Sequence, residues 1–480
     1  MRRIALVLSF LLLAFGCRSR SSSGGSESRS MPGGSAAVTG PLLSYGDVVD
    51  RVAPAVVTIR SSQRVRAPQQ FPFSDDPFFR QLFGGTVPRE GRTQVEESLG
   101  SGVIVRSDGY ILTNHHVIDG ADQIKVDLIG SRRTYSAKVV GSDPPSDLAV
   151  LKISAGDLPV LQPGDSDQVR VGDVCLAVGN PLGVGETVTS GIISAKGRAT
   201  GLSNGSFQDF LQTDAPINKG NSGGALVNTR GELIGINSQI LSPTGVNIGI
   251  GFAIPSNMAK TVMNQLIGKG KVQRGMIGVT VQRVTSDLAS GFGLKEARGI
   301  VISSVTAGGA ADKAGLKQGD VVLQLNGKDV SDTNVFRNEI AAMTPGTEVT
   351  LTIWRDAAQQ QVRVRLGEWT GEVAGEQQQG GGGGETGGRL GITAEPLTPE
   401  IAAQLGLRRG TQGVVVTQVD PTGSAAQAGV QAGDVIQEVN RQPVRSPGEV
   451  HDALQRSGNR AAVLLVNRGG QTIYIPVPQQ

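Results

Sequence analysis

Residues 218–226 constrain this chain more than any other segment, because they place a serine, Ser222, between glycines. A serine hydroxyl is a poor nucleophile unless a base removes its proton, and the oxyanion that its attack creates needs backbone N–H donors close by. Gly220 and Gly223 leave the backbone free to aim such donors. The segment predicts an acyl-transfer site. Glycine-rich serine turns also occur in ordinary loops, so the residues upstream decide between the two.

The general base is found by elimination, because the chain has 3 histidines: His115, His116 and His451. Only the first two lie near a suitable acid, in residues 111–117, which predict an apolar strand that leads into a short polar turn. We select His116, since it fits the Thr-x-x-His pattern in which trypsin-like folds place the base. The side chain of His115 is expected to point elsewhere and to cap the turn.

The third residue should be a carboxylate that accepts a hydrogen bond from the other ring nitrogen of the histidine. Asp147 is the candidate, because it joins a polar turn to the apolar run 148–151 and its side chain would emerge at the mouth of a strand. Asp143 is the competitor, which we place in the turn before two prolines, where acids make local hydrogen bonds. The chain order His, Asp, Ser is that of the chymotrypsin-type double β-barrel.

Composition agrees with an all-β-dominated fold of several domains. A length of 480 residues should hold about three domains, and 68 glycines suit short strands joined by tight turns. The 45 Lys and Arg residues nearly balance the 42 Asp and Glu residues, and only 4% of residues are aromatic. This balance excludes the basic, aromatic-laced surface of a nucleic-acid-binding protein.

The 2 cysteines exclude a disulfide framework and a Cys/His metal cluster. Cys175 lies in the apolar run 174–178 and is expected to be a buried thiol that packs as a small hydrophobic residue. Acyl transfer by the three residues above needs no metal and no cofactor, so we expect neither.

The first 17 residues have the pattern of an export signal, in which two arginines precede the apolar run 4–15. That run is too short to span a membrane. Cys17 ends a stretch similar to a bacterial lipoprotein cleavage box, so we favour a lipid anchor at this residue; ordinary cleavage with loss of Cys17 is the alternative. Residues 18–44 are rich in Ser and Gly and are expected to form a flexible tether.

Several motifs together closely resemble the DegP/DegQ type of HtrA serine proteases, over about residues 45–480. The resemblance implies an ATP-independent serine endopeptidase of the bacterial periplasm that degrades misfolded proteins, with a trypsin-like protease domain at residues 45–270. The motifs that carry it are residues 100–104, 113–117, 147–150, 179–181, 185–191, 212–215, 220–224 and 251–255.

The resemblance also assigns roles to the site residues. Ser222 would attack the scissile carbonyl, His116 would take its proton, and Asp147 would orient His116. The amides of Gly220 and Ser222, together with Asn221, would form the oxyanion hole.

The specificity pocket is expected between residues 213–217 and 247–252, as in trypsin-like folds. Ile217 and the neighbouring Pro216 place no negative charge there. We therefore expect small aliphatic side chains, rather than Lys or Arg, before the cut.

Residues 61–98 form a long polar insertion that carries several phenylalanines. Loops of this length are usually functional or disordered. In the resembling family this loop reaches into neighbouring subunits, which implies homotrimers and higher oligomers. A hydrophobic tuck against its own domain is the alternative.

The second half of the chain repeats itself, because residues 299–322 return as residues 413–436 with the shared pattern Ala-Gly-x-x-x-Gly-Asp-Val. Both copies resemble bacterial PDZ domains, at residues 271–370 and 389–480. The Gln/Gly-rich residues 371–388 between them are expected to be a flexible linker.

A PDZ domain adds a peptide strand to a sheet edge and holds the terminal carboxylate with loop amides. By resemblance, Gly275, Met276, Ile277 and Gly278 form this loop in the first copy, and residues 388–392 match it in the second. The first copy is expected to bind C-terminal peptides and the second to serve assembly, but the sequence leaves the reverse open.

Two glycine-rich loops, residues 183–187 and 197–206, match the activation and sensor loops of the resembling family. Arg198 lies at the position that reports peptide occupancy there. Ordinary hairpin connections are the alternative.

Two rival functions stay open. A holdase or peptide-binding scaffold would use the PDZ domains and leave the three catalytic candidates silent, and chaperone activity can coexist with proteolysis. A processing protease dedicated to one substrate would have the same residues.

Overall fold

The computed structural model describes residues 44–66, 93–128, 133–180, 187–200, 207–218, 220–240, 248–371, 390–408, 410–456 and 461–478. Several sequence predictions concern residues outside these ranges. They are the export signal with Cys17, the tether, the aromatic part of the insertion, the predicted activation loop, most of the sensor loop, and the Gln/Gly linker. No helix in the described part is long and apolar enough to cross a membrane.

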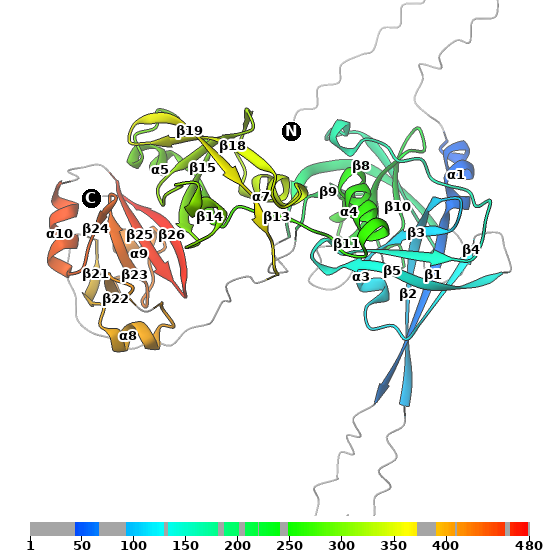
Figure 1. Ribbon diagram of the computed structural model, residues 1–480, viewed down its shortest axis with the longest axis horizontal. Coiled ribbons are helices and arrows are strands. Elements are labelled where there is room, and N and C mark those ends of the chain that lie inside the picture. The colour runs from blue at the N-terminus through cyan, green and yellow to red at the C-terminus, as the bar shows by residue number, and fades with distance from the viewer. Residues whose placement is uncertain are drawn as a thin grey trace, which may run out of the picture. The chain divides into compact units, whose positions relative to one another are not determined.

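Six antiparallel strands close the first barrel, in the order β1-β2-β3-β6-β5-β4 (Figure 1). Ile59, Ile104 and Ile111 are fully buried inside it. Gly102 lets these side chains meet, because a Cβ there would lie 2.7 Å from Ile111 and 2.8 Å from Ile59. The strands are β1 (Val56–Arg66), β2 (Thr93–Arg106), β3 (Tyr110–Thr113), β4 (Gln123–Leu128), β5 (Thr134–Asp143) and β6 (Leu148–Ile153).

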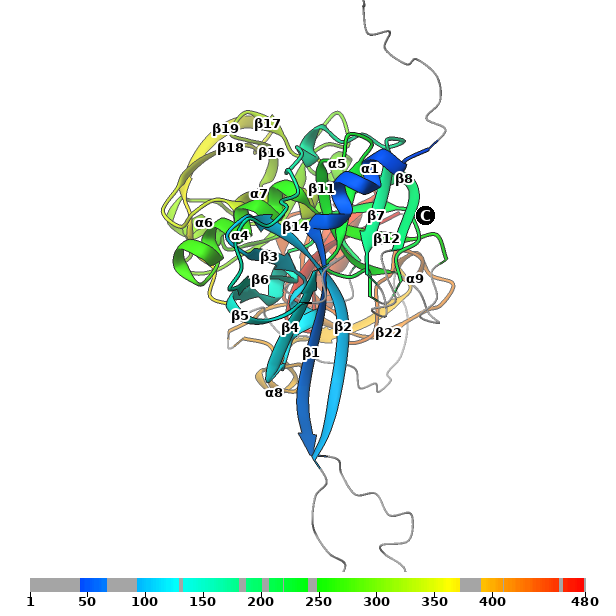
Figure 2. The same cartoon turned by 90° about the vertical axis from the view of Figure 1, so that its right-hand side faces the viewer.

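The predicted insertion begins as strand rather than as loop. β1 and β2 pair without interruption from Val56 opposite Val103 to Arg66 opposite Thr93. Figure 2 shows the two strands running on together beyond the barrel. The paired strands therefore continue past Ser61 on one side and begin before Ser98 on the other.

A second closed barrel follows, in the order β10-β11-β12-β9-β8-β7. Cys175 is fully buried in its core, as predicted, and burial raises the pKa of its thiol to about 11. The strands are β7 (Val174–Gly179), β8 (Thr187–Arg198), β9 (Phe210–Thr213), β10 (Ala225–Asn228), β11 (Leu233–Ile240) and β12 (Gly251–Pro255).

One hydrophobic cluster joins the two barrels, with Leu148 and Val150 of the first and Phe210 and Phe252 of the second. Helix α4 adds Leu266 to this cluster and ends at Gly270 in the left-handed conformation, where glycine carries no Cβ penalty. The helices of this region are α1 (Gly46–Val52), α3 (His115–Ile118) and α4 (Ser256–Lys269), with short 3-10 turns η1 (Ala53–Ala55), η2 (Pro144–Ser146) and η3 (Ser166–Gln168).

The next sheet, in the first repeat, has the order β14-β15-β16-β18-β19, with β17 paired to β16. A separate two-stranded pairing joins β13 to β20. The strands are β13 (Gly275–Met276), β14 (Val279–Arg283), β15 (Ile300–Val305), β16 (Val321–Leu325), β17 (Lys328–Asp329), β18 (Glu348–Arg355), β19 (Ala358–Arg365) and β20 (Gly367–Glu368). The helices are α5 (Ser286–Gly291), α6 (Ala310–Lys313) and α7 (Thr333–Ala342).

The second repeat has the same sheet order, β21-β22-β23-β25-β26, with β24 paired to β23. Its strands are β21 (Ile392–Pro396), β22 (Val414–Val419), β23 (Val435–Val439), β24 (Gln442–Pro443), β25 (Ala462–Arg468) and β26 (Gln471–Val477). Its helices are α8 (Pro399–Gln404), α9 (Ser424–Gln427) and α10 (Pro447–Arg456).

The repeated Gly-Asp-Val pattern has one structural role in both copies. The carboxylate of Asp320 accepts from Arg355 Nε at 2.6 Å, and that of Asp434 accepts from Arg468 Nε at 2.7 Å. Both aspartates are almost fully buried. The first ion pair joins the loop before β16 to the end of β18, and the second joins the loop before β23 to the end of β25.

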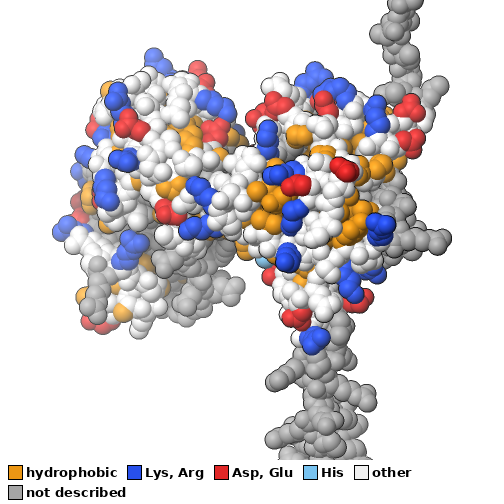
Figure 3. Space-filling view, turned by 45° about the vertical axis from the view of Figure 1, so that its right-hand side comes forward, with side chains coloured by type: hydrophobic (Ala, Val, Ile, Leu, Met, Phe, Trp, Pro, Cys, Tyr) orange, Lys and Arg blue, Asp and Glu red, His pale blue; other side chains and the backbone are white. Residues whose placement is uncertain are grey.

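Acidic and basic side chains are interspersed on the face drawn in Figure 3. This mixture agrees with the small formal net charge of +3.

Candidate active site

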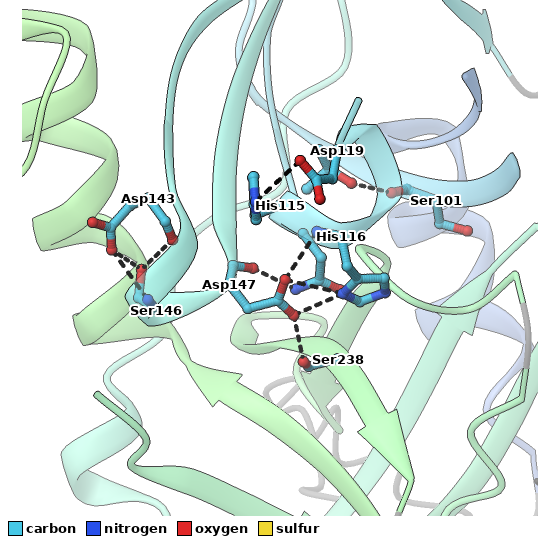
Figure 4. A network of polar contacts seen from close by, with 10 residues as sticks. Ser101, His115, His116, Asp119, Asp143, Ser146, Asp147 and Ser238 are labelled. Carbon is cyan, nitrogen blue, oxygen red and sulfur yellow. Dashed lines mark hydrogen bonds and ion pairs between the residues drawn. The ribbon is translucent and has the colours of Figure 1, made fainter. Parts of the chain in front are cut away.

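His116 and Asp147 meet at the mouth of the first barrel. His116 Nδ1 lies 3.0 Å from Asp147 Oδ1 and 2.9 Å from Oδ2, and the His116 backbone N–H donates to Oδ1 at 3.0 Å (Figure 4). Ser238 of β11 donates its hydroxyl to Asp147 Oδ2 at 2.9 Å. The carboxylate thus holds the ring of His116 and the first turn of α3, and leaves Nε2 for other contacts.

Local backbone geometry explains why Asp147 reaches this position. It follows the η2 turn and has φ 55° and ψ 40°, a left-handed conformation that is uncommon for residues other than glycine. Its backbone N–H donates to the Pro144 carbonyl, and its own carbonyl accepts from the His115 N–H and the Asn114 side chain. The two prolines that sequence analysis placed beside Asp143 therefore build the turn that presents Asp147.

The two competing residues, Asp143 and His115, have other partners. Asp143 accepts from the Ser146 backbone N–H and forms a buried ion pair with Arg274. His115 Nε2 lies 3.6 Å from the Asp119 carboxylate. The remaining histidine, His451, is hydrogen-bonded to Gln455 on α10, in the second repeat.

The backbone around Ser222 is held by hydrogen bonds from several directions. The Asn221 N–H donates to the Asn218 carbonyl, the Gly223 N–H to the Asn237 carbonyl, and the Gly224 N–H to the Asn221 carbonyl. Within the described residues, the Ser222 N–H has no backbone acceptor. Since the Asn221 amide is already occupied, this conformation offers the Ser222 amide and not that of Asn221 to an incoming oxyanion.

Ser222 and His116 belong to different barrels but share a set of contacts. Ser238 donates to Asp147, and the preceding residue, Asn237, accepts from the Gly223 N–H through its carbonyl. Two consecutive residues of β11 therefore contact both parts of the site. In the described part of the chain, no hydrogen bond joins His116 to the Ser222 hydroxyl. Catalytic hydrogen bonds are often long in unliganded sites and shorten when substrate binds.

Ile217 is almost fully buried, and Gly251 of β12 lies against it. A Cβ on Gly251 would come within 2.9 Å of Ile217 Cδ1. The apolar Ile217 side chain therefore contributes to the interior of the second barrel just before the Ser222 loop. Asn247, the first residue of the predicted far wall at 247–252, lies outside the described ranges.

The predicted carboxylate-binding loop links β13 to β14. Its Ile277 carbonyl accepts from the Ala311 N–H and its Gly278 carbonyl from the Thr306 N–H, whereas their own amides have no backbone acceptor in the described residues. In the second copy, the Leu390 and Gly391 carbonyls accept in the same way from Ala425 and Asp420. The two loops therefore have matching backbone geometry.

Arg198 is the last residue of β8, where it pairs with Phe210 of β9, and its side chain is exposed. The neighbouring Gln208 carbonyl accepts hydrogen bonds from Asn334 and Asn338 of α7, each at 2.6 Å. The segment just before β9, the strand paired with Arg198, therefore contacts the first repeat directly.

Sequence analysis missed the contributions of two serines to this site: Ser238 binds Asp147, and the Ser101 hydroxyl donates to the Gly220 carbonyl at 2.6 Å. Ser238 lies in a strand without a recognisable motif, so nothing in the sequence indicates that it binds Asp147. Ser101 lies in a motif noted above, Gly100-Ser101-Gly102, whose function the sequence alone did not indicate. The described residues contain no group of three or more His, Cys, Asp or Glu side chains that could hold a metal ion.

Comparison with known protein families gives three matches along the chain. A model described as a trypsin-like peptidase domain matches residues 100–236. Models described as PDZ domains match residues 275–366 and 415–468. The matches fall on the two barrels and on the two repeats.

Similar proteins cover nearly the whole chain. A probable periplasmic serine endoprotease DegP-like of Chlamydia trachomatis is 42% identical over 448 residues, which is 90% of this chain and 88% of the relative. The periplasmic pH-dependent serine endoprotease DegQ of Escherichia coli is 41% identical over 448 residues, which is 92% of this chain and 93% of the relative. The solved structure of the HtrA-type protease AlgW with decapeptide is 45% identical, covers 68% of this chain and 99% of that chain, and has a TM-score of 0.55.

Proposed function

This chain belongs to the DegP/DegQ type of HtrA periplasmic serine endoproteases, and we propose that it degrades misfolded envelope proteins through Ser222, His116 and Asp147. The observation that carries the assignment of residues is the contact of His116 Nδ1 with both oxygens of the Asp147 carboxylate, at 3.0 and 2.9 Å. Such a carboxylate fixes the tautomer in which Nε2 can accept a proton, and it stabilises the imidazolium that follows.

The proposed reaction proceeds through an acyl-enzyme. Ser222 Oγ attacks the scissile carbonyl carbon while its proton moves to His116 Nε2. The C–N bond then breaks, and His116 gives the proton to the leaving amine. A water molecule attacks the resulting ester by the same route, which releases the new carboxyl end and restores the serine.

The oxyanion hole in this proposal consists of the amides of Gly220 and Ser222. The N–H groups of Asn221, Gly223 and Gly224 all donate to backbone carbonyls, which leaves the Ser222 N–H as the amide among residues 221–224 that can bind the oxyanion. Asn221 acts through its carbonyl, which holds the Gly224 N–H, rather than through its own amide.

The first PDZ domain is proposed to bind the C-terminal end of a peptide and to activate cleavage. The amides of Ile277 and Gly278 are the proposed carboxylate ligands, since their carbonyls are already engaged and orient the loop. Arg198 is the proposed reporter of peptide binding, because it pairs with β9 and the segment just before β9 contacts α7 of the same PDZ domain. The solved relative AlgW contains a bound decapeptide, which agrees with peptide recognition in proteins of this type.

A casein-cleavage assay beside an aggregation assay on a heated client protein tests the function. Wild type should cleave casein, and Ser222→Ala should not. If Ser222→Ala cleaves at the wild-type rate, the proposed protease site is wrong. If neither cleaves but both suppress aggregation, the protein acts as a holdase and the proteolytic proposal fails. Chaperone activity of Ser222→Ala beside full proteolysis by wild type would show that both activities coexist.

Membrane attachment through Cys17 is a separate part of the proposal. A lipid on this residue would anchor the enzyme, and the Ser/Gly-rich residues 18–44 would let it reach into the periplasm. Cys17→Ser should then release soluble protein or block signal cleavage. A mature N-terminus downstream of Cys17 without lipid would contradict the anchor. Light-scattering mass on the purified protein tests the proposed homotrimer and higher oligomers.

A further inference from the structure

The motif Gly100-Ser101-Gly102 has no role in the mechanism above, although it lies directly against the Ser222 loop. Ser101 belongs to β2 of the first barrel and is fully buried. Its backbone N–H donates to the Ser222 carbonyl at 2.8 Å, and its hydroxyl donates to the Gly220 carbonyl at 2.6 Å. One residue of the first barrel thus binds the loop of the second barrel on both sides of Asn221.

The hydroxyl of Ser101 both donates and accepts a hydrogen bond. Besides donating to Gly220, it accepts from the Asn180 backbone N–H at 2.9 Å. The Ser101 carbonyl accepts from the Thr113 hydroxyl at 2.7 Å, on the strand that leads to His116 (Figure 4). Ser101 therefore contacts the strand before the proposed base as well as the loop of the proposed nucleophile.

Glycines on both sides allow this close approach. A Cβ on Gly223, which has φ 83°, would lie 2.1 Å from the Ser101 carbonyl oxygen and 2.3 Å from Thr113 Oγ1. A Cβ on Gly100 would lie 2.6 Å from Val117 and 3.2 Å from the Ser222 carbonyl oxygen. The two glycine-rich motifs pack backbone to backbone, and side chains at either position would separate them.

These contacts fix the orientation of the peptide groups around Ser222. A peptide group is planar, so a carbonyl held on one side directs the following N–H to the other. The Gly220 carbonyl points to Ser101 while the Asn221 N–H points to Asn218, and the Ser222 carbonyl is held by the Ser101 N–H. The peptide group that carries the Ser222 N–H lies between these two fixed groups.

We propose that Ser101 is a positioning residue of this protease, which holds the Gly220 and Ser222 carbonyls so that the Ser222 amide between them stays aimed at the tetrahedral intermediate. The inference rests on the proposed function, because it takes Ser222 as the nucleophile. Loss of the Ser101 hydroxyl should therefore destabilise the transition state of the reaction more than it destabilises the folded protein.

The test compares Ser101→Ala with Ser256→Ala in the full-length protein. Ser256 is a matched control, because it is also buried and donates its hydroxyl to a backbone carbonyl, that of Gly164, at 2.8 Å. The measurements are kcat and KM on a peptide substrate, the affinity for a peptide boronic acid with a valine side chain, and the thermal midpoint. A boronic acid forms a tetrahedral adduct with an active serine, so its affinity reports the oxyanion hole.

Ser101→Ala should lower kcat roughly 10- to 100-fold, while KM changes by less than about threefold. This decrease in kcat is no larger than the one usually seen when an oxyanion-hole donor is removed. The affinity for the boronic acid should fall by the same factor as kcat. Ser256→Ala should lose a similar amount of thermal stability and keep both kcat and boronic acid affinity. If Ser101→Ala does not fold, Ser101→Cys, with its weaker donor, should give the same pattern with a smaller loss.

If Ser101→Ala folds and behaves like Ser256→Ala, the positioning role is wrong. If Ser101→Ala raises KM and leaves kcat unchanged, the residue shapes substrate binding and the inference also fails. Ser222→Ala separates a failure of the positioning role from a failure of the proposed function. If Ser222→Ala is inactive, the protease assignment stands whatever Ser101→Ala does. If Ser222→Ala is active, both the protease assignment and the positioning role fail.

Discussion

Arg274 holds the carboxylate of Asp143 in a site where both side chains are almost fully buried. Arg274 Nη1 donates to Asp143 Oδ1 at 2.8 Å, Nη2 donates to Oδ2, and the ring of Phe207 lies 4.7 Å from the guanidinium. Asp143 begins the turn that ends at Asp147, and Arg274 directly precedes the first PDZ domain's loop at Gly275. The pair therefore joins two parts of the chain that sequence analysis had assigned to different domains.

Breaking this ion pair should destabilise the protein strongly. Asp143→Asn leaves the guanidinium of Arg274 buried without a charged partner, which costs about 3–5 kcal/mol. Calorimetry should show the loss in the transition of the protease domain. Asp320→Asn, which breaks the similarly buried pair with Arg355, should instead lower the transition of the first PDZ domain. An equal midpoint of the protease-domain transition in wild type and Asp143→Asn would contradict the prediction.

The two adjacent histidines should differ greatly in their effect on turnover. His116→Ala should lower kcat by several orders of magnitude, because His116 is the proposed base and the residues of a catalytic triad act as one unit. His115→Ala should cost far less, since the His115 ring lies near Asp119 and not near the Asp147 carboxylate. Steady-state kinetics on a peptide substrate measure both variants. Near-normal turnover of His116→Ala would show that the base is assigned to the wrong residue.

The residue before the cleaved bond should be small and aliphatic, such as Val, Ala or Ile. Ile217 is apolar and almost fully buried, and the one acidic residue of the predicted wall at 213–217, Asp214, has its carboxylate bound by the Ile192 N–H at 2.7 Å. A digest of a peptide library, read by mass spectrometry, measures this preference. A majority of Lys or Arg at that position would rule it out.

A peptide with an apolar C-terminal residue and a free carboxylate should raise the cleavage of a separate reporter substrate. The amides of Ile277 and Gly278 would bind the carboxylate, so the same peptide with an amidated end should have little effect. Arg198→Ala should keep peptide affinity, measured by calorimetry, and lose most of the activation. Equal activation of wild type and Arg198→Ala would sink the reporter role.

Asp209 should make stability fall as the pH rises from about 4 to about 6. Burial, with help from Asp167, raises the pKa of Asp209 from 3.8 to about 6. In that range the folded protein keeps a proton that the unfolded chain has lost, so unfolding becomes more favourable with rising pH, and the effect is complete above about pH 6. Asp209→Asn should therefore be more stable than wild type at pH 7.5, by on the order of 2 kcal/mol, and similar to it near pH 4.

Thermal midpoints at pH 4.5 and 7.5 measure this effect. Asp173→Asn is a control of opposite sign, because hydrogen bonds from Arg170 lower the pKa of the partly exposed Asp173. Its loss of stability relative to wild type develops below about pH 4, so it should be nearly the same at pH 4.5 and at pH 7.5. A constant difference between Asp209→Asn and wild type over this range would refute the role of Asp209.

The sequence by itself determined the fold class, the two repeats and the candidates for the catalytic triad. These follow from local patterns: glycines around Ser222, a strand that ends at His116, and prolines before Asp147. Each pattern lies within about ten residues, where the periodicity and turn preferences of the chain decide the structure. The same local patterns predicted the buried Cys175.

Only the tertiary structure decided which groups meet across the barrels. Ser101 reaches the Gly220 carbonyl over a separation of 119 residues, Ser238 reaches Asp147 over 91, and Arg274 reaches Asp143 over 131. The structure also decided that the Asn221 amide is occupied. The direction of a hydrogen bond depends on backbone orientation, and here that orientation is fixed by strands packed from two different barrels, which no local pattern of residues encodes.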